Sequence, residues 1–97
     1  MEINKQIKYE EDTKVVLAEK YIIRIINDIN SLCNEIITML KKEINDHLKE
    51  MKPETKVFYY WLIGDHYRYQ AEVATAEEIG EKIDNAQEMY KLAALEA

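Results

Sequence analysis

The sequence is poor in residues that interrupt helices: it has two glycines and one proline in 97 residues. A chain with so few turn-forming residues cannot build the many hairpins of an all-β or loop-rich fold. The composition therefore predicts a few long helices. The single cysteine, Cys33, excludes an intrachain disulfide. Its place in an apolar helical stripe favours a buried small hydrophobe over a reactive thiol.

Positive charge is also scarce, since 13 Lys and Arg stand against 19 Asp and Glu, a formal net charge of -6. Nucleic acids and anionic membranes both attract a cationic face, so neither is an expected partner. The longest apolar run extends from Val57 to Ile63. This is far short of the ~20 residues that span a bilayer, and the amino terminus lacks the apolar core of a signal peptide. We therefore expect a cytoplasmic protein.

The chain is long enough for one domain with a small core. Residues 1–12 are rich in Lys, Glu, Asn and Gln with scattered apolar positions, so we expect a flexible N-terminal arm there. Residues 13–97 are expected to form a single helical domain.

The first expected helix covers about residues 13–51, where neither Gly nor Pro occurs. Two apolar stripes run along it with the alternating steps of three and four that indicate helix. The first stripe contains Val15, Ala18, Ile22, Ile25, Ile29, Leu32, Ile36 and Met39. The second contains Val16, Ile23, Ile26, Cys33, Ile37, Leu40, Ile44 and Leu48. Together they are broader than a two-stranded coiled coil requires, so neighbours are expected on two sides.

Two further helices follow, over about residues 53–74 and 76–96. Pro53 ends the first helix because the residue before a proline avoids the α conformation, and it can itself occupy the first turn of the next helix. Thr75 and Glu78 have the spacing of a capping box that would start the third helix. The fold class is thus all-α, an antiparallel three-helix bundle of the hairpin type with one long first helix.

Helix lengths predict self-association. At 1.5 Å per residue the first helix spans ~58 Å and the others ~33 Å and ~32 Å. The shorter helices cannot cover the longer one, and an uncovered apolar surface favours a homo-oligomer, most simply a dimer. The expected oligomer interface consists of Val15, Tyr21, Ile22, Ile23, Ile25 and Ile26, with Val16 also uncovered.

The segment 56–74 reads KVFYYWLIGDHYRYQAEVA and resembles the fifth helix of 14-3-3 proteins, which typically reads KVFYLKMKGDYYRYLAEVA. Residues 21–38, with a Leu-Cys-Asn-Glu core, are similar to the fourth helix of that family. Ile83-Asp-Asn-Ala-Gln and Tyr90 are similar to the sixth. The resemblance covers about three quarters of the chain and implies a 14-3-3-like fragment or divergent member.

The resemblance implies an adaptor that binds phosphoserine or phosphothreonine peptides. In the family an Arg-Tyr pair on the fifth helix and two basic residues on the third hold the phosphate. Arg68 and Tyr69 match the pair, and a guanidinium can bind phosphate through two parallel hydrogen bonds. Asp65 and Glu72 lie three and four residues from Arg68 and are expected to support it.

The sequence departs from the family in places that bear on this site. Trp61 and Ile63 replace two family lysines, residues 1–20 show no copy of the third helix, and the last three family helices are absent. The phosphate site is therefore expected to be incomplete. A family tyrosine at the place of Tyr21 lies at the dimer interface, but here isoleucines follow it where polar residues are usual, which implies a new apolar contact.

Other interpretations remain open. Arg68 could form only a structural ion pair with Asp65 or Glu72, and the chain could be a truncated or engineered oligomeric helical scaffold without phosphopeptide binding. The aromatic side chains of the second helix, Trp61 among them, are expected to pack in the core or an interface, Tyr69 excepted. A tetratricopeptide-like unit around Trp61 and Gly64 is the weakest alternative, since stable solenoids need about three repeats.

No catalytic site is expected, because the sequence has neither a glycine-rich phosphate loop nor a nucleophile beside a credible base. His47 and His66 each follow an aspartate, but adjacent helical residues point apart. No third ligand has metal-site spacing. We therefore expect no metal, no cofactor and no enzymatic activity, and a role in protein–protein interaction.

Overall fold

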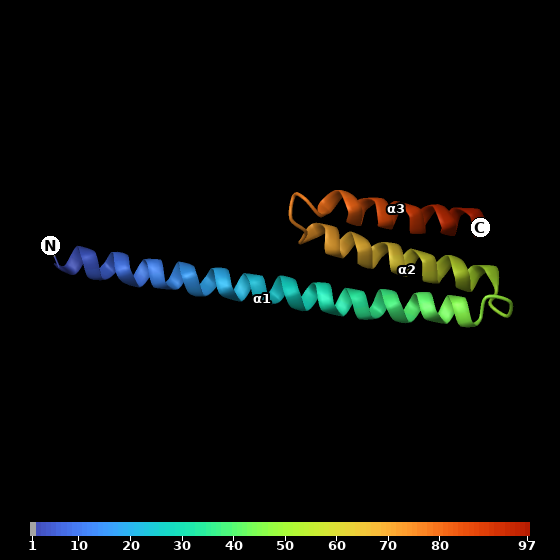
Figure 1. Ribbon diagram of the computed structural model, residues 1–97, viewed down its shortest axis with the longest axis horizontal. Helices are drawn as coiled ribbons and strands as arrows, with labels where there is room; N and C mark the ends of the chain where they lie inside the picture. Colours follow the sequence, from blue (N-terminus) through green and yellow to red (C-terminus); the bar gives the residue numbers. More distant parts are fainter. Residues whose placement is uncertain (1) are drawn as a thin grey trace.

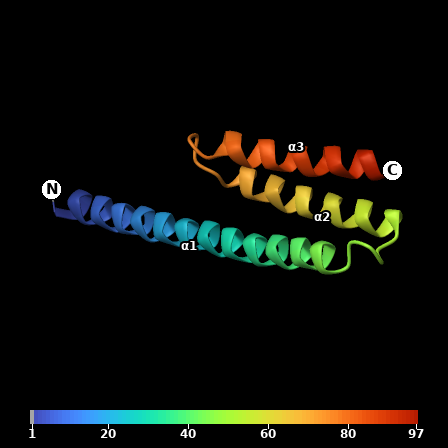
Figure 2. The same ribbon diagram turned by 45° about the vertical axis from the view of Figure 1, so that its right-hand side comes forward.

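The computed structural model describes residues 2–97 and contains three α-helices, α1 (Glu2–Asp46), α2 (Pro53–Glu72) and α3 (Ile79–Glu96). The chain reverses direction between consecutive helices, and α2 lies between α1 and α3 in both views (Figures 1 and 2). This confirms the predicted all-α architecture with a long first helix. Within residues 2–97 none of the helices has a stretch apolar and long enough to cross a bilayer.

Helix α1 begins much earlier than the sequence analysis predicted. Residues 2–12, expected as an arm outside the helical domain, continue α1 without a break; Met1 lies outside the described residues. The physical reason is that this segment lacks Gly and Pro and is rich in Glu, Lys and Gln, whose straight side chains lose little conformational entropy in a helix. With 45 residues, α1 is ~68 Å long and accounts for most of the 73 Å length of the molecule.

Helix α1 also ends earlier than expected, at Asp46 rather than near residue 51. The carbonyl of His47 accepts hydrogen bonds from the amides of Glu50 and Met51 at 3.1 and 2.9 Å, which closes a turn. Lys52 is extended, with φ -66° and ψ 149°, as a residue before proline prefers. Pro53 opens α2, as predicted.

The turn between α2 and α3 is closed by backbone groups and not by a capping box. Helix α3 starts at Ile79, three residues after the predicted start, and its N-cap Glu78 makes no side-chain capping bond. Instead the carbonyl of Thr75 accepts the amides of Glu78 and Ile79 at 3.1 and 3.0 Å. At the other end of this turn, Val73 bonds the carbonyl of Gln70, so α2 ends two residues before the predicted residue 74.

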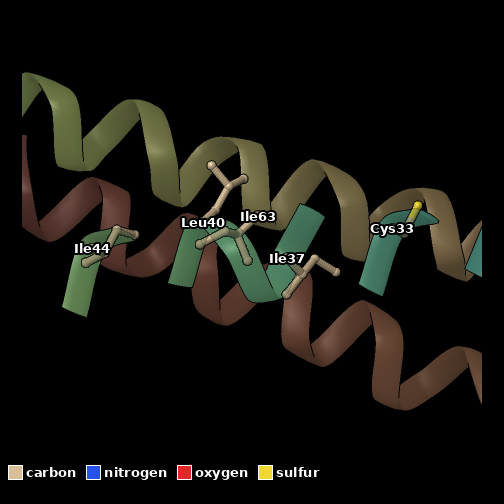
Figure 3. Close-up of a cluster of buried hydrophobic side chains, with 5 residues drawn as sticks. All are labelled: Cys33, Ile37, Leu40, Ile44 and Ile63. Carbon is tan, nitrogen blue, oxygen red and sulfur yellow. The ribbon is translucent and has the colours of Figure 1, made fainter. Parts of the chain in front are cut away.

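The core lies between the carboxyl-terminal half of α1 and α2. Its buried side chains are Cys33, Ile37, Leu40 and Ile44 from α1 and Ile63 from α2 (Figure 3). The α1 members step by four, three and four and so form one helix face. They belong to the second of the two predicted stripes. Ile63, which stands where the 14-3-3 pattern has a lysine, is fully buried.

Helices α2 and α3 approach closely through small residues. Gly64 and Ala71 of α2 and Ala86 and Ala93 of α3 are all buried. A Cβ atom on Gly64 would lie 2.7 Å from Cε1 of Tyr90. The glycine at this position therefore lets the tyrosine ring approach the backbone of α2 this closely.

The amino-terminal half of α1 extends beyond the α2–α3 hairpin (Figure 1). Most of the residues predicted to be uncovered are exposed in the single chain; these are Val15, Val16, Tyr21, Ile22, Ile23 and Ile25. Ile26 is half-buried. The geometric part of the prediction, an apolar surface that α2 and α3 do not reach, is therefore confirmed.

Candidate functional site

Arg68 and Tyr69 lie together on the solvent-facing side of α2, near its carboxyl end. The Arg68 side chain is 58% exposed, and its guanidinium carbon lies 5.7 Å from the centroid of the Tyr69 ring. Such a cation–π contact holds the guanidinium plane near the phenol without using its N–H donors. The two groups can therefore present hydrogen-bond donors to the same anion.

Asp65 is the only predicted supporting carboxylate that the structure places near Arg68. Its Oδ1 lies 3.8 Å from Nη2 of Arg68, longer than the roughly 2.8 Å of a charge-assisted hydrogen bond. An exposed pair at this separation contributes little stability. Glu72 is exposed and makes no ion pair with Arg68 among the described residues. Arg68 is thus loosely held and keeps most of its donors free.

Tyr90 of α3 also contacts Asp65. Its hydroxyl donates a hydrogen bond of 2.6 Å to the same Oδ1 atom. Burial, together with the hydrogen bond to Asp65, raises the pKa of Tyr90 to about 12. Tyr90 therefore stays a neutral donor, and Asp65 is fixed by α3 as well as by its place on α2.

His66 also borders the site. The sequence analysis did not identify it as a residue that positions Tyr69. Its ring meets the Tyr69 ring edge-on, with centroids 5.2 Å apart. Its Nδ1 lies 2.6 Å from the carbonyl of Leu62, a bond that sets the orientation of the imidazole. The spacing of three residues between His66 and Tyr69 could have indicated the contact.

Two aromatic side chains share the exposed face of α2 with Arg68. Phe58 and Trp61 are each 57% exposed, so of the two expectations for Trp61, core or interface, the single chain excludes the core. The reason is its angular position: Ile63 and Gly64, two and three residues further on, take the buried positions instead. Trp61 lies seven residues before Arg68, a separation of ~10.5 Å along one side of the helix.

Gln70 forms a second polar feature that the sequence analysis did not identify. Its side chain is 1% exposed, and Nε2 donates to the carbonyl of Asn30 at 3.2 Å and to Oδ1 of Asn34 at 2.7 Å. Its Oε1 is buried without a hydrogen-bond partner. The residue borders a cavity of about 270 Å³ between α1, α2 and the start of α3. The 14-3-3 pattern has leucine at this place.

No metal centre is formed by the described part of the chain. His47 contacts the carboxylates of Glu43 and Glu50 at 3.5 Å each, all on the surface near the end of α1. Among the side chains of residues 3–97 there is no group of three His, Cys, Asp or Glu that could hold a metal ion. The solvent-facing Arg68–Tyr69 pair, by contrast, has the donor chemistry of an anion site.

The fold agrees with comparisons to known proteins. The model of the 14-3-3 protein family matches residues 1–97. The chain is 32% identical over 80 residues to the 14-3-3 protein zeta of Bombyx mori, covering 82% of this chain and 32% of that protein. It is 35% identical over 92 residues to the checkpoint signal transducer rad24 of Schizosaccharomyces pombe, covering 90% and 33%. No solved structure gives a significant match.

The chain therefore belongs to the 14-3-3 family. A further relative, 14-3-3 protein homolog 2 of Schistosoma mansoni, is 37% identical over 79 residues, covering 81% of this chain. The chain spans about a third of the length of these relatives. Proteins of this family are non-enzymatic adaptors, in agreement with the prediction that this chain is not an enzyme.

Proposed function

We propose that this chain is a 14-3-3-like adaptor module that binds phosphoserine or phosphothreonine peptides through Arg68 and Tyr69. The observation that carries the proposal is the exposed guanidinium next to an exposed phenol, with its nearest carboxylate at 3.8 Å. A phosphate dianion offers Arg68 two parallel hydrogen bonds, which Asp65 at that distance does not. The Tyr69 hydroxyl adds a donor without a further charge.

The proposed site is incomplete, so its affinity is expected to be low. Two lysines of the family pattern are replaced by Trp61 and Ile63, and Ile63 is buried in the core. The positive charge at the site therefore comes from Arg68. Trp61 instead offers an apolar surface ~10.5 Å from Arg68. An extended peptide covers that distance in about three residues. We expect a peptide with an apolar residue three positions from the phosphoserine to bind better than one with a charged residue there.

A titration with a phosphoserine peptide and its unphosphorylated twin tests the proposal. The phosphorylated peptide should bind more tightly, and Arg68→Ala should remove the difference. Arg68→Lys should keep only part of it, because an ammonium cannot form the bidentate contact. The other arginine of the chain, Arg24, provides the matched control, since Arg24→Ala changes the net charge equally but lies on α1. Equal affinity for both peptides would reject phosphate recognition.

The proposal includes self-association through the exposed amino-terminal part of α1. The interface residues are those predicted from the sequence, Val15, Tyr21, Ile22, Ile23, Ile25 and Ile26, of which only Ile26 is half-buried in the single chain. We place the adaptor in the cytoplasm, with phosphorylated proteins as partners. The second candidate function is a self-associating helical scaffold without phosphopeptide binding, favoured by this apolar surface alone. The same titration separates the two candidates.

A further inference from the structure

The cavity beside Gln70 is a polar feature of the fold that the proposed phosphate site does not use. The turn between α2 and α3 lies over the middle of α1 (Figures 1 and 2), and the cavity of about 270 Å³ is lined from these three parts of the chain. Gln70 is buried while Arg68 is exposed, so the two features lie on different sides of α2. Six of the seven residues that line the cavity are polar or charged: Asn30, Asn34, Gln70, Glu78, Glu81 and Lys82.

The amide of Gln70 is held in one orientation. Its Nε2 donates to the backbone carbonyl of Asn30 at 3.2 Å and to Oδ1 of Asn34 at 2.7 Å. Turning the amide over would place Oε1 against the Asn30 carbonyl, and two oxygens without a proton between them repel each other. Oε1 is therefore fixed as a buried acceptor without a partner, and what it lacks is a hydrogen-bond donor.

This arrangement lowers the stability of the free chain. A buried acceptor without a donor costs free energy that an apolar side chain of similar size would not. The 14-3-3 pattern has leucine at the place of Gln70, so the family resemblance does not account for the amide. Groups that break the packing rules in this way are typical of binding sites. The amide of Gln70 therefore points to a ligand that supplies the donor.

The charges around the cavity favour a cationic ligand. Two carboxylates, Glu78 and Glu81, and one ammonium group, Lys82, line it. Among the side chains of residues 3–97, none of these three forms an ion pair with another residue. A cation with N–H groups would both supply the donor that Oε1 lacks and offset the excess negative charge. An anion would be repelled by the two carboxylates and would give Oε1 no donor.

We propose that this cavity binds a primary alkylammonium group, which donates to Oε1 of Gln70 and whose charge is offset by Glu78 and Glu81. Because a water molecule occupies about 30 Å³, the cavity has room for an ammonium group with a short alkyl chain. Oε1 is buried in the free chain, so the lining side chains must move when the ligand enters. Glu78 and Glu81 are exposed and can rotate without breaking an ion pair.

A titration of the full chain with propylammonium chloride tests the site, followed by the NMR signals of the side-chain amides of Gln70 and Asn34. Tetramethylammonium chloride at equal ionic strength is the matched control, because it has the same charge and a similar size but no N–H donor. Propylammonium should shift both amides in a saturable way, and tetramethylammonium should not. Equal shifts with the two cations, or no shift at high millimolar propylammonium, would overturn the proposal and leave water as the occupant of the cavity.

Substitutions at the cavity provide a second test with the same ligand, read from backbone amide signals near the turn. Gln70→Leu should raise the dissociation constant for propylammonium by about tenfold or more. Its control is Gln87→Leu on the exposed side of α3, which should leave the dissociation constant unchanged. Similar affinities of Gln70→Leu and wild type would contradict the proposal.

Lys82→Met tests the sign of the ligand charge. Removal of this ammonium group should tighten propylammonium binding by about threefold, because it removes a like charge from the cavity. Lys91→Met changes the net charge equally from an exposed position ~13.5 Å further along α3, and its effect should be smaller because salt screens charges at that distance. Weaker binding by Lys82→Met would overturn the assignment of a cation.

A second ligand identifies the source of the ammonium group. Nα-acetyl-lysine amide carries the same group on the side chain of an amino acid. Tighter binding of this compound than of propylammonium would assign the cavity to a lysine side chain of a partner protein, and the reverse order would assign it to a small free amine. Both orders support the proposal, whereas binding of neither compound would reject it.

Discussion

The hydroxyl of Tyr90 donates a 2.6 Å hydrogen bond to Oδ1 of Asp65, the carboxylate oxygen that also lies 3.8 Å from Nη2 of Arg68. This contact connects α3 to the exposed face of α2. It gives the Asp65 carboxylate a hydrogen bond from a neutral donor, so the carboxylate does not need Arg68 as its partner. The geometry of the proposed phosphate site therefore depends on a residue of another helix.

The first prediction concerns stability at high pH. Because the pKa of Tyr90 is raised from 10.0 to about 12 in the folded chain, unfolding is linked to proton release from the tyrosine. The contribution of Tyr90 is complete below pH 10 and should be lost as pH rises from about 10 to about 12, amounting to roughly 2 kcal/mol. Denaturant unfolding of wild type and Tyr90→Phe across this pH range measures the contribution of Tyr90 to the free energy of unfolding. Parallel pH profiles for the two proteins would contradict the prediction.

The second prediction compares the two glycines. Gly64→Ala should destabilise the fold by about 1–3 kcal/mol, since the new Cβ would lie 2.7 Å from Cε1 of Tyr90 and force the ring to move. Gly80→Ala is the matched control: no atom lies within 4 Å of its Cβ position, so the variant should gain up to ~1 kcal/mol of helix propensity. Thermal or urea unfolding reports both. Equal stabilisation by the two substitutions would show that the Tyr90 contact is not tight.

The third prediction concerns the buried amide of Gln70. Its Oε1 has no hydrogen-bond partner, which costs free energy, while the exposed Asn34 side chain can turn to water once Nε2 is removed. Gln70→Leu should therefore stabilise the chain by about 1 kcal/mol. The exposed residue Gln87 is the control, and Gln87→Leu should stay within roughly 0.5 kcal/mol of wild type. A loss of stability in Gln70→Leu would show that the amide has a partner in solution.

The fourth prediction concerns the reactivity of the only cysteine. Burial raises the pKa of the Cys33 thiol, and the side chain lies in the core between α1 and α2. A thiol reagent at neutral pH should therefore react much more slowly with the folded chain than with the chain in denaturant, because it needs an accessible thiolate. The ratio of the two rates measures the local opening of this helix pair. Similar rates would indicate that the core is open in solution.

Much of the secondary structure could be predicted from the residues themselves. The absence of Gly and Pro over residues 13–51 predicts one long helix, and Pro53 marks the start of the second, since proline excludes the α conformation before it. The helix limits were less predictable. The turns at His47 and Thr75 are closed by backbone hydrogen bonds that the composition does not encode, and the helix-forming residues 2–12 were interpreted as an arm.

The candidate site was predictable in part. Arg68 and Tyr69 were identified from a residue run that resembles one family, and the structure places both on the exposed face of α2. The contacts of Tyr90 with Asp65 and of Gln70 with Asn34 were not predicted. Each joins residues 25 or more positions apart, and nothing in the local spacing brings such residues together.

The sequence by itself determined that α1 carries two apolar stripes, because helical periodicity sets the angle of each side chain around the axis. Only the tertiary structure decided which stripe is buried. Cys33 and Ile37 face α2, while Leu32 and Met39 remain exposed. Both stripes are equally apolar, so the choice depends on where the chain reverses and on the close contact of α2 with α3. The same packing buries Ile63 and leaves Trp61 exposed to solvent, because the two side chains point in different directions around α2 and only that of Ile63 faces the core.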